Sequence, residues 1–292
     1  MIRYPVSPEG LRALIDAEAP GWLTDAEERT GRFRQEGRYE ESSPNWSRVK
    51  PVYMRLQHGK CAYCERRLAA EDFGGAIEHD LEHYRPKGAV PPWPSAKIAR
   101  DRRISYRFAT GEAFPEGYYL LAYHVLNYAT ACKKCNSPLK SNYFPIAGER
   151  AQGDDPSQLR AELPFLLFPL GELDEDPEEI LTFTGISPVP RVKRGVRWRR
   201  ARVTIDFFEL DQREELWRER AEKIVALFIA LEMNRGGSER NQELAGRAIE
   251  TLLSPASGHV NCGCAFRVLY QKDRTLAEEM ARAAQSYLDS QS

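Results

Sequence analysis

Two pairs of cysteines constrain this chain more than any other feature of its sequence. They form Cys61-Ala-Tyr-Cys64 and Cys132-Lys-Lys-Cys135, each pair separated by two residues. A tight turn with this spacing directs both sulfurs to one point, so the two pairs can supply the four thiolates that tetrahedral zinc prefers. Four sulfur ligands leave no position for water or substrate, and the sequence therefore predicts a structural zinc. Four unrelated buried thiols, or redox pairs, are the alternative.

Imidazole and carboxylate groups are unusually dense between the two cysteine pairs. Residues 76–87 read Ala-Ile-Glu-His-Asp-Leu-Glu-His-Tyr-Arg-Pro-Lys, which places Glu78-His79 and Glu82-His83 within six residues. Asn127 follows later, and Asn136 comes directly after the last cysteine of the second pair. A histidine, then an asparagine, then a polar residue just past a C-x2-C pair is the ordered pattern of an HNH motif.

The chain thus resembles the HNH, or ββα-metal, nucleases. The segments Lys60–Glu65, Glu82–Lys87, Tyr119–Tyr123 and Cys135–Pro145 are similar to the PtuB-type HNH proteins of Septu and some retron-associated anti-phage systems. The resemblance covers most of residues 46–215. It implies a first strand that ends at Glu82-His83, a return that starts at Asn127 and a helix that Asn136 opens.

The resemblance also implies catalytic roles. His83 would be the general base, Glu82 and Asn136 would be oxygen ligands of a catalytic Mg²⁺ or Mn²⁺ ion, and Asn127 would orient the loop that carries the base. His79 lies four residues before His83, so on a strand both would face one side. His79 is therefore a further candidate ligand, with Glu78 as another supporting group. A histidine without a metal role is the alternative for His79.

Basic residues suggest where nucleic acid would bind. We expect Arg85, Lys87, Lys133, Lys134 and Lys140 to ring the cleft and contact phosphates. A denser run, residues 191–202, includes Arg197, Arg199 and Arg200 around one tryptophan. It is either a nucleic-acid strip or a helix start that docks on the acidic stretch Glu172–Glu179, and the sequence leaves both interpretations open.

The pattern along the chain predicts an α+β fold, with a zinc-braced ββα-metal HNH core embedded in a largely helical chain. Residues 1–57 read as an N-terminal helical brace that starts at Ser7-Pro-Glu, and residues 58–148 as the nuclease core. Residues 149–190 read as an irregular connector with one short apolar strand, Phe165–Phe168. Residues 191–292 read as a C-terminal helical region, because apolar residues recur there at a spacing near 3.6.

A second metal site is a weaker candidate in the C-terminal region. Cys262-Gly-Cys264 lies near His259 in the sequence, which offers three ligands and no fourth. The sequence does not decide whether these residues bind a metal.

Charge and hydropathy narrow the function. The chain has 42 Lys and Arg against 43 Asp and Glu, so a nucleic-acid surface must be local. No apolar stretch reaches the length of a membrane span, and we expect a cytoplasmic protein with reduced thiols and no membrane contact.

The sequence therefore predicts a metal-dependent HNH endonuclease acting on DNA. The family resemblance implies the nuclease subunit of an anti-phage system with a separately encoded ATPase partner. No G-x-x-x-x-G-K-[ST] loop occurs in this sequence, so any nucleotide hydrolysis would have to come from that partner. An RNA-cleaving HNH nuclease is one alternative, because the catalytic residues do not read the 2′-hydroxyl. A non-catalytic zinc-knuckle adaptor that binds nucleic acid or protein is the other.

Overall fold

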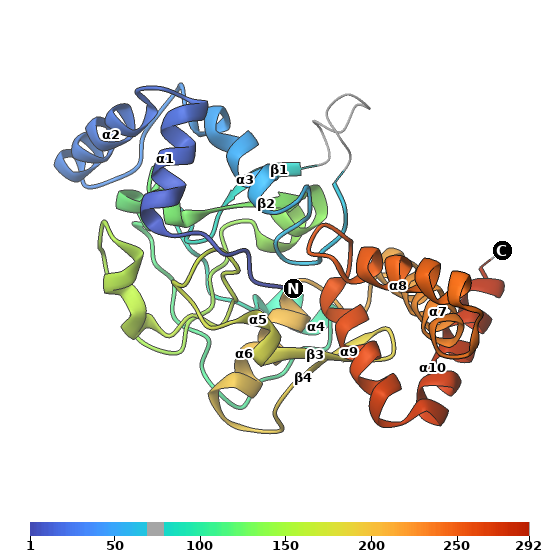
Figure 1. Cartoon of the computed structure of the whole chain (residues 1–292). Coiled ribbons are helices and arrows are strands. Elements are labelled where there is room, and N and C mark those ends of the chain that lie inside the picture. The colour runs from blue at the N-terminus through green and yellow to red at the C-terminus, as the bar shows by residue number, and fades with distance from the viewer. Residues whose placement is uncertain (69–78, 292) are drawn as a thin grey trace.

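Helices and two small antiparallel sheets alternate along the chain, which is the α+β class that the sequence predicts (Figure 1). The computed structural model describes residues 1–68 and 79–291. The elements in chain order are α1 (Pro8–Glu18), α2 (Trp22–Glu36), η1 (Trp46–Val49), α3 (Lys50–Leu56), β1 (His79–His83), α4 (Ala96–Asp101), η4 (Tyr119–Leu121), η5 (Val125–Asn127), β2 (Tyr128–Cys132), η6 (Cys135–Lys140), η7 (Pro156–Glu162), α5 (Pro177–Ile180), β3 (Leu181–Thr184), β4 (Ser187–Pro190), α6 (Gly195–Phe207), α7 (Glu214–Gly236), α8 (Glu239–Leu253), α9 (Val260–Lys272) and α10 (Arg274–Asp289).

The antiparallel pair β1–β2 positions the candidate catalytic residues. Its register sets His79 opposite Cys132 and His83 opposite Tyr128. Strand β1 therefore begins beside the second cysteine pair and ends at His83, while Asn127 immediately precedes β2. Because side chains alternate along a strand, Asp80 and Glu82 share one face of β1. The helical segment η6 follows β2 and contacts both strands.

The N-terminal helices cover this hairpin. The expected helix start is confirmed, since the Ser7 hydroxyl caps α1 by accepting a hydrogen bond from the Gly10 amide at 3.0 Å. Helix α3 packs directly on both strands, and the buried rings of Trp22 and Phe33 from α2 contact Tyr123 just before η5. Burying these large rings fixes α2 against the chain that leads into β2.

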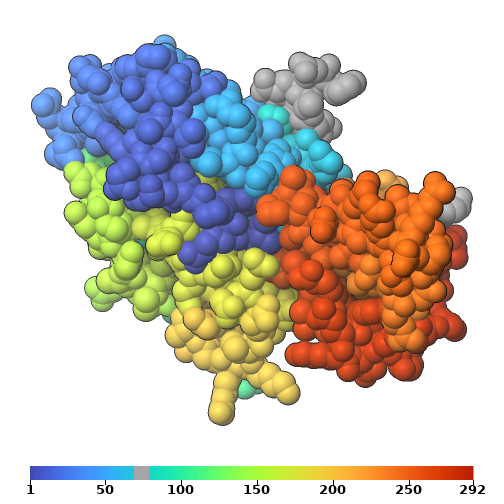
Figure 2. Space-filling model, viewed as in Figure 1, coloured from blue at the N-terminus to red at the C-terminus, as the bar shows by residue number. Residues whose placement is uncertain are grey.

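The C-terminal helices form a second apolar cluster at one side of the molecule (Figure 2). The apolar spacing near 3.6 correctly predicts α7 and α10, which pack against each other and carry the buried residues Ile224 and Ala281. Gly237 and Ser254 lie just past the ends of α7 and α8, as their turn chemistry suggests. The larger cluster draws on the chain from Met1 to Leu216 and also includes Val260 of α9.

One secondary-structure prediction is wrong. Phe165–Phe168 is buried but forms no strand, because its polar backbone groups pair with side chains and distant loops. The Phe165 amide donates to the Pro145 carbonyl, and the Leu166 carbonyl accepts from the Tyr84 hydroxyl at 2.6 Å. The strands of this region are β3 and β4, a hairpin near the end of the segment expected to be irregular.

Candidate active site and metal centre

The four cysteines of the two pairs converge on one buried point. Their sulfur atoms all lie within 4.8 Å of one another, and the Sγ atoms of Cys64 and Cys132 are 3.8 Å apart. Sulfur ligands at about 2.3 Å from a tetrahedral zinc are separated by about 3.8 Å, so the observed spacing fits that ion. Cys61 and Cys64 lie on a turn, whereas Cys132 ends β2 and Cys135 opens η6. The cluster could bind a zinc ion that joins this turn to the hairpin.

A cation from the C-terminal region lies beside the thiols. The guanidinium of Arg213, which precedes α7, donates from Nη1 to the Sγ atom of Cys135 at 3.2 Å. Four thiolates around one Zn²⁺ carry a net negative charge, and a neighbouring guanidinium offsets it. The cysteine motif gave no signal for this residue, because 78 positions separate it from Cys135.

A cleft of about 430 Å³ lies where β1, η6 and η1 meet. Its lining includes three residues that the sequence singles out, Glu82, His83 and Asn136, and the predicted phosphate contact Lys87. A larger cavity of about 800 Å³ beside α1 is lined by none of these residues. The fold thus gathers the candidate base and both candidate oxygen ligands in one place.

Asn127 fixes the chain just after β1. Its Oδ1 atom accepts a hydrogen bond from the Arg85 amide at 2.7 Å, and its Nδ2 group donates to the carbonyls of Arg85 and Leu121, each at 3.0 Å. The Asn127 carbonyl also accepts from the Tyr84 amide. Asn127 thereby holds Arg85 through its side chain and Tyr84 through its backbone carbonyl, and the orienting role that the resemblance implies stays a prediction.

The imidazole of His83 has a defined orientation. Its Nε2 atom lies 3.0 Å from the carbonyl oxygen of Ala122. A carbonyl only accepts, so Nε2 carries the proton in this contact and Nδ1 keeps a lone pair. Burial, followed by the charge of Lys87, lowers the pKa of His83 well below its ordinary value. The ring is therefore neutral near pH 7 and able to accept a proton.

The carboxylate of Glu82 is buried against a lysine. Lys140 Nζ lies 3.1 Å from Glu82 Oε1 and donates to the His83 carbonyl at 3.3 Å. Burial raises the pKa of Glu82, and the charge of Lys140 opposes that rise. Lys140 is thus tied to the two residues at the end of β1. The prediction that it contacts phosphate is corrected, because its side chain is fully enclosed.

Asp80 joins the candidate ligands, although the sequence did not single it out. Its Oδ2 atom accepts a hydrogen bond from Asn136 Nδ2 at 2.7 Å and lies 3.4 Å from Lys133 Nζ. The amide oxygen of Asn136 is the atom with metal-binding chemistry, and the donor set of Asp80, Glu82 and Asn136 is therefore all oxygen. This set fits Mg²⁺ or Mn²⁺. The sequence feature that could have identified Asp80 is its position two residues before Glu82, because this spacing places both residues on one face of a strand.

The two histidines of the Glu-His pairs lie in different places. His79 is buried at the start of β1, opposite Cys132, and it does not line the cleft that contains His83. Glu78 lies outside the described residues. Of the two histidines, His83 is therefore the one that lines the cleft.

Arg85 is corrected as a phosphate contact. Its side chain is 3% exposed, and its Nε atom donates to Glu162 Oε2 at 2.9 Å inside the fold. Lys87, in contrast, lines the cleft, with Nζ 4.6 Å from the centroid of the Trp46 ring. Lys133 and Lys134 are exposed beside it. Lys87 is therefore the expected phosphate contact that lines the cleft, whereas Lys133 reaches its edge through Asp80 and Lys134 pairs with Glu215 at 3.8 Å.

The basic run of residues 191–202 docks on the acidic stretch, which was one of its two interpretations. Arg197 pairs with Glu175 at 2.6 Å, and Arg200 is buried against Asp174 at 2.6 Å. Arg199 lies over the ring of Phe108, 5.5 Å from its centroid. The expected nucleic-acid strip is corrected for Arg200, because its guanidinium is enclosed and neutralised.

Cys262, Cys264 and His259 do not form a metal cluster in the described part of the chain. The Sγ atom of Cys262 contacts the Gly185 carbonyl at 3.6 Å, whereas His259 Nε2 lies 2.8 Å from Glu219 Oε2. Among residues 1–68 and 79–291, the four cysteines of the two pairs are the one group of three or more His, Cys, Asp or Glu close enough to share an ion. His259 instead links α9 to α7.

Comparisons with known proteins give one partial relative. The chain is 33% identical to the Septu protein PtuB of Bacillus mycoides (strain KBAB4) over 140 residues, which is 47% of this chain and 40% of that protein. The chain thus matches well under half of the relative's length. No family model matches, and no solved structure matches. No described helix is both long and apolar enough to cross a membrane. The partial similarity supports a relationship to PtuB-type Septu proteins.

Proposed function

We propose that this protein is a metal-dependent HNH endonuclease that hydrolyses phosphodiester bonds in DNA. The observation that carries the proposal is the placement of His83 in one cleft with Glu82 and Asn136, with Nε2 engaged by the Ala122 carbonyl. Burial lowers the pKa of the imidazole, which favours its neutral form. Nδ1 is then the atom that can take a proton from an attacking water. The proposed base thus has a fixed direction beside the candidate ligands.

The residues around His83 support the same chemistry. Lys140 contacts the His83 carbonyl and Asn127 accepts from the Arg85 amide, so they act as positioning residues for the backbone at and just after His83. Asp80, Glu82 and Asn136 would hold a Mg²⁺ or Mn²⁺ ion, which would supply the positive charge that stabilises the phosphate and the leaving oxygen. Lys87 would contact a flanking phosphate from the cleft wall. The four cysteines would bind zinc and brace this arrangement without reacting.

We further propose an anti-phage role with a separately encoded ATPase. This rests on the resemblance to PtuB-type proteins and on the partial similarity to the Septu protein PtuB. A cytoplasmic location follows from that role. In this setting the nuclease supplies the cutting chemistry and the partner supplies nucleotide hydrolysis.

The test is cleavage of supercoiled plasmid and of structured RNA by the purified zinc-loaded protein with Mn²⁺ or Mg²⁺. We expect metal-dependent DNA cleavage that is lost in His83→Ala and in Glu82→Ala, with zinc content unchanged. His58→Asn is the control, because His58 is an exposed histidine outside the cleft lining. Cleavage of RNA alone would favour the RNA nuclease. Binding without cleavage of either polymer, even with the ATPase present, would favour the adaptor.

A further inference from the structure

Residues 37–46 lead from the end of α2 to Trp46, the first residue of η1, and Trp46 lines the cleft although it is far in sequence from the HNH-like motif. We propose that Trp46, at the end of this 37–46 segment, is a positioning residue that orients both His83 and Lys87, and that buried Glu41 holds the segment in place. The inference deepens the proposed function, because it names what aims the proposed base and the proposed phosphate contact.

Trp46 touches the imidazole directly. The rings of Trp46 and His83 are perpendicular, at 89°, with centroids 4.9 Å apart. Tyr128 contacts the imidazole at 5.0 Å and 75°, and its hydroxyl donates to the same Ala122 carbonyl that accepts from His83. The imidazole therefore has an aromatic ring from each of two distant segments beside it. Two rings packed against the imidazole restrict its rotation away from the Ala122 carbonyl.

The same tryptophan positions the cleft lysine. Lys87 Nζ lies 4.6 Å from the ring centroid of Trp46 and 5.3 Å from that of Tyr39, so the ammonium lies over two aromatic rings of the 37–46 segment. An ammonium over ring faces is held by the ring quadrupoles and keeps hydrogens for a further ligand. Tyr39 and Trp46 thus fix the position of the Lys87 ammonium in the cleft.

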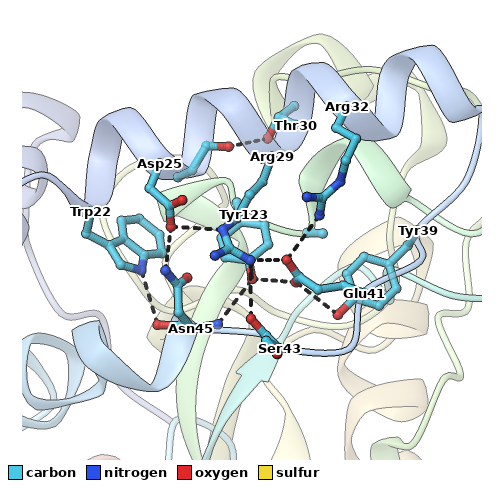
Figure 3. A network of polar contacts seen from close by, with 12 residues as sticks. Trp22, Asp25, Arg29, Thr30, Arg32, Tyr39, Glu41, Ser43, Asn45 and Tyr123 are labelled. Atoms are coloured by element: carbon cyan, nitrogen blue, oxygen red, sulfur yellow. Dashed lines mark hydrogen bonds and ion pairs between the residues drawn. The ribbon is translucent and has the colours of Figure 1, made fainter.

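Glu41 anchors this segment to α2 and to Tyr123 (Figure 3). Its carboxylate pairs with Arg29 and, at 3.2 Å, with Arg32, and it accepts a hydrogen bond from the Tyr123 hydroxyl at 2.6 Å. The Tyr39 hydroxyl donates to it at 3.4 Å. The Glu41 side chain is only 4% exposed, so four partners converge on one enclosed carboxylate.

The residue directly before Trp46 is held as well. The Asn45 amide donates to the Tyr123 hydroxyl at 3.2 Å, and its carbonyl accepts from Trp22 Nε1 at 3.2 Å, as Figure 3 shows. Arg29 reaches the Ser43 carbonyl at 3.3 Å. The backbone leading to Trp46 is therefore fixed at three points by side chains of α2 and Tyr123.

Trp46 is more than a core residue, because it remains partly exposed and lines the cleft beside His83 and Lys87. A purely structural tryptophan would change stability when replaced. A positioning tryptophan would also change the state of the imidazole in a protein that stays folded.

The test uses Trp46→Ala, Trp46→Phe and Glu41→Gln, with Glu40→Gln as the matched control. Glu40 is the adjacent carboxylate, 66% exposed and paired with the exposed Arg38. The first readout is the ¹⁵N chemical shifts of the His83 ring near pH 7.5, assigned by loss of the signals in His83→Gln. They report the tautomer without requiring any cleavage.

We expect two well-separated ¹⁵N shifts in the native protein, as a single Nε2–H tautomer gives. Trp46→Ala should draw the two shifts together, Trp46→Phe should largely restore the separation, and Glu41→Gln should fall between them. On the cleaved polymer, kcat should drop at least tenfold in Trp46→Ala, whereas Glu40→Gln should match the native protein in both readouts.

Unchanged His83 shifts in a folded, zinc-loaded Trp46→Ala protein would overturn the inference. So would equal effects of Glu40→Gln and Glu41→Gln. If Trp46→Ala does not fold, the ¹⁵N shifts of the His83 ring in Glu41→Gln decide the matter, and shifts unchanged from the native protein would overturn the inference. If the native protein cuts neither polymer but the shifts respond as expected, the positioning inference stands and the proposed nuclease function fails.

Discussion

Lys140 Nζ lies 3.1 Å from the carboxylate of Glu82, and the fold encloses both side chains. This pair ties the segment after the second cysteine pair to the end of β1. The ammonium also donates to the His83 carbonyl, so one buried cation touches the proposed ligand and the backbone of the proposed base. It places Lys140 behind the proposed catalytic residues rather than among the proposed phosphate contacts.

Removing this cation should therefore be costly. Lys140→Met leaves Glu82 enclosed without its partner, and breaking such a pair from one side costs about 3 kcal/mol or more. We expect a loss of that order in the free energy of unfolding, measured by urea denaturation. Mn²⁺ should restore part of it, because an ion held by Glu82 stabilises the folded state. Lys133→Met, which removes an exposed partner of Asp80, should change stability little.

Asn127→Asp is a near-isosteric test of the orienting role. The aspartate keeps an acceptor for the Arg85 amide, but it cannot donate to the carbonyls of Arg85 and Leu121. Two buried carbonyls then face a carboxylate, and we expect a loss of about 2 to 4 kcal/mol in the free energy of unfolding. Cleavage should fall with zinc retained. Asn241→Asp, on the exposed face of α8, should leave both measurements unchanged.

Local pattern predicted the parts of the site that depend on local geometry. The C-x2-C pairs predicted that the four thiols converge, and the order of His83, Asn127 and Asn136 predicted the region of the chain that forms the cleft. Arg85 was misassigned because its environment is set by Glu162, 77 residues later in the chain. A cation after a Glu-His pair looks the same in sequence whether a distant carboxylate neutralises it or not.

The same limit applies to the cleft wall. Trp46 reaches His83 from the N-terminal helical region, where the sequence predicted only a brace. No periodicity or spacing relates the two residues, because their contact depends on how α2 and η1 pack over the hairpin. The strand predicted at Phe165–Phe168 fails for a related reason, since a short apolar run is buried equally well without a partner strand.

The cysteine cluster predicts one zinc per chain. Cys64→Ser should abolish stoichiometric zinc in a mass-spectrometric metal assay and destabilise the fold, because the site needs all four thiolates. Cys262→Ser is the matched control, a buried cysteine outside the cluster whose Sγ atom lies 3.6 Å from the Gly185 carbonyl. It should retain one zinc. Equal zinc content in both variants would contradict the assignment of the site.

Acid should destabilise the protein through His259. Burial lowers the pKa of His259 to about 4 from its ordinary 6.5, although the hydrogen bond to Glu219 opposes that shift. As the pH falls below about 6.5, His259 becomes protonated in the unfolded chain, whereas in the folded protein it stays neutral until about pH 4. The contribution of His259 to the free energy of unfolding is therefore fully present above about pH 6.5. It is lost as the pH falls from that value to about 4, by at most about 3 kcal/mol.

The variant that isolates this effect is His259→Asn, since asparagine tolerates the positive φ of 51° at this position and does not titrate in this range. Zinc release in acid affects the native protein and the variant alike, so the difference between their unfolding free energies reports His259. We expect that difference to shrink as the pH falls from 7 to 5, because only the native protein loses the contribution of a neutral imidazole. Parallel pH curves for the two proteins would mean that His259 titrates equally in the folded and unfolded states. The contact with Glu219 that joins α9 to α7 would then offset the effect of burial and leave the pKa of His259 at its ordinary value.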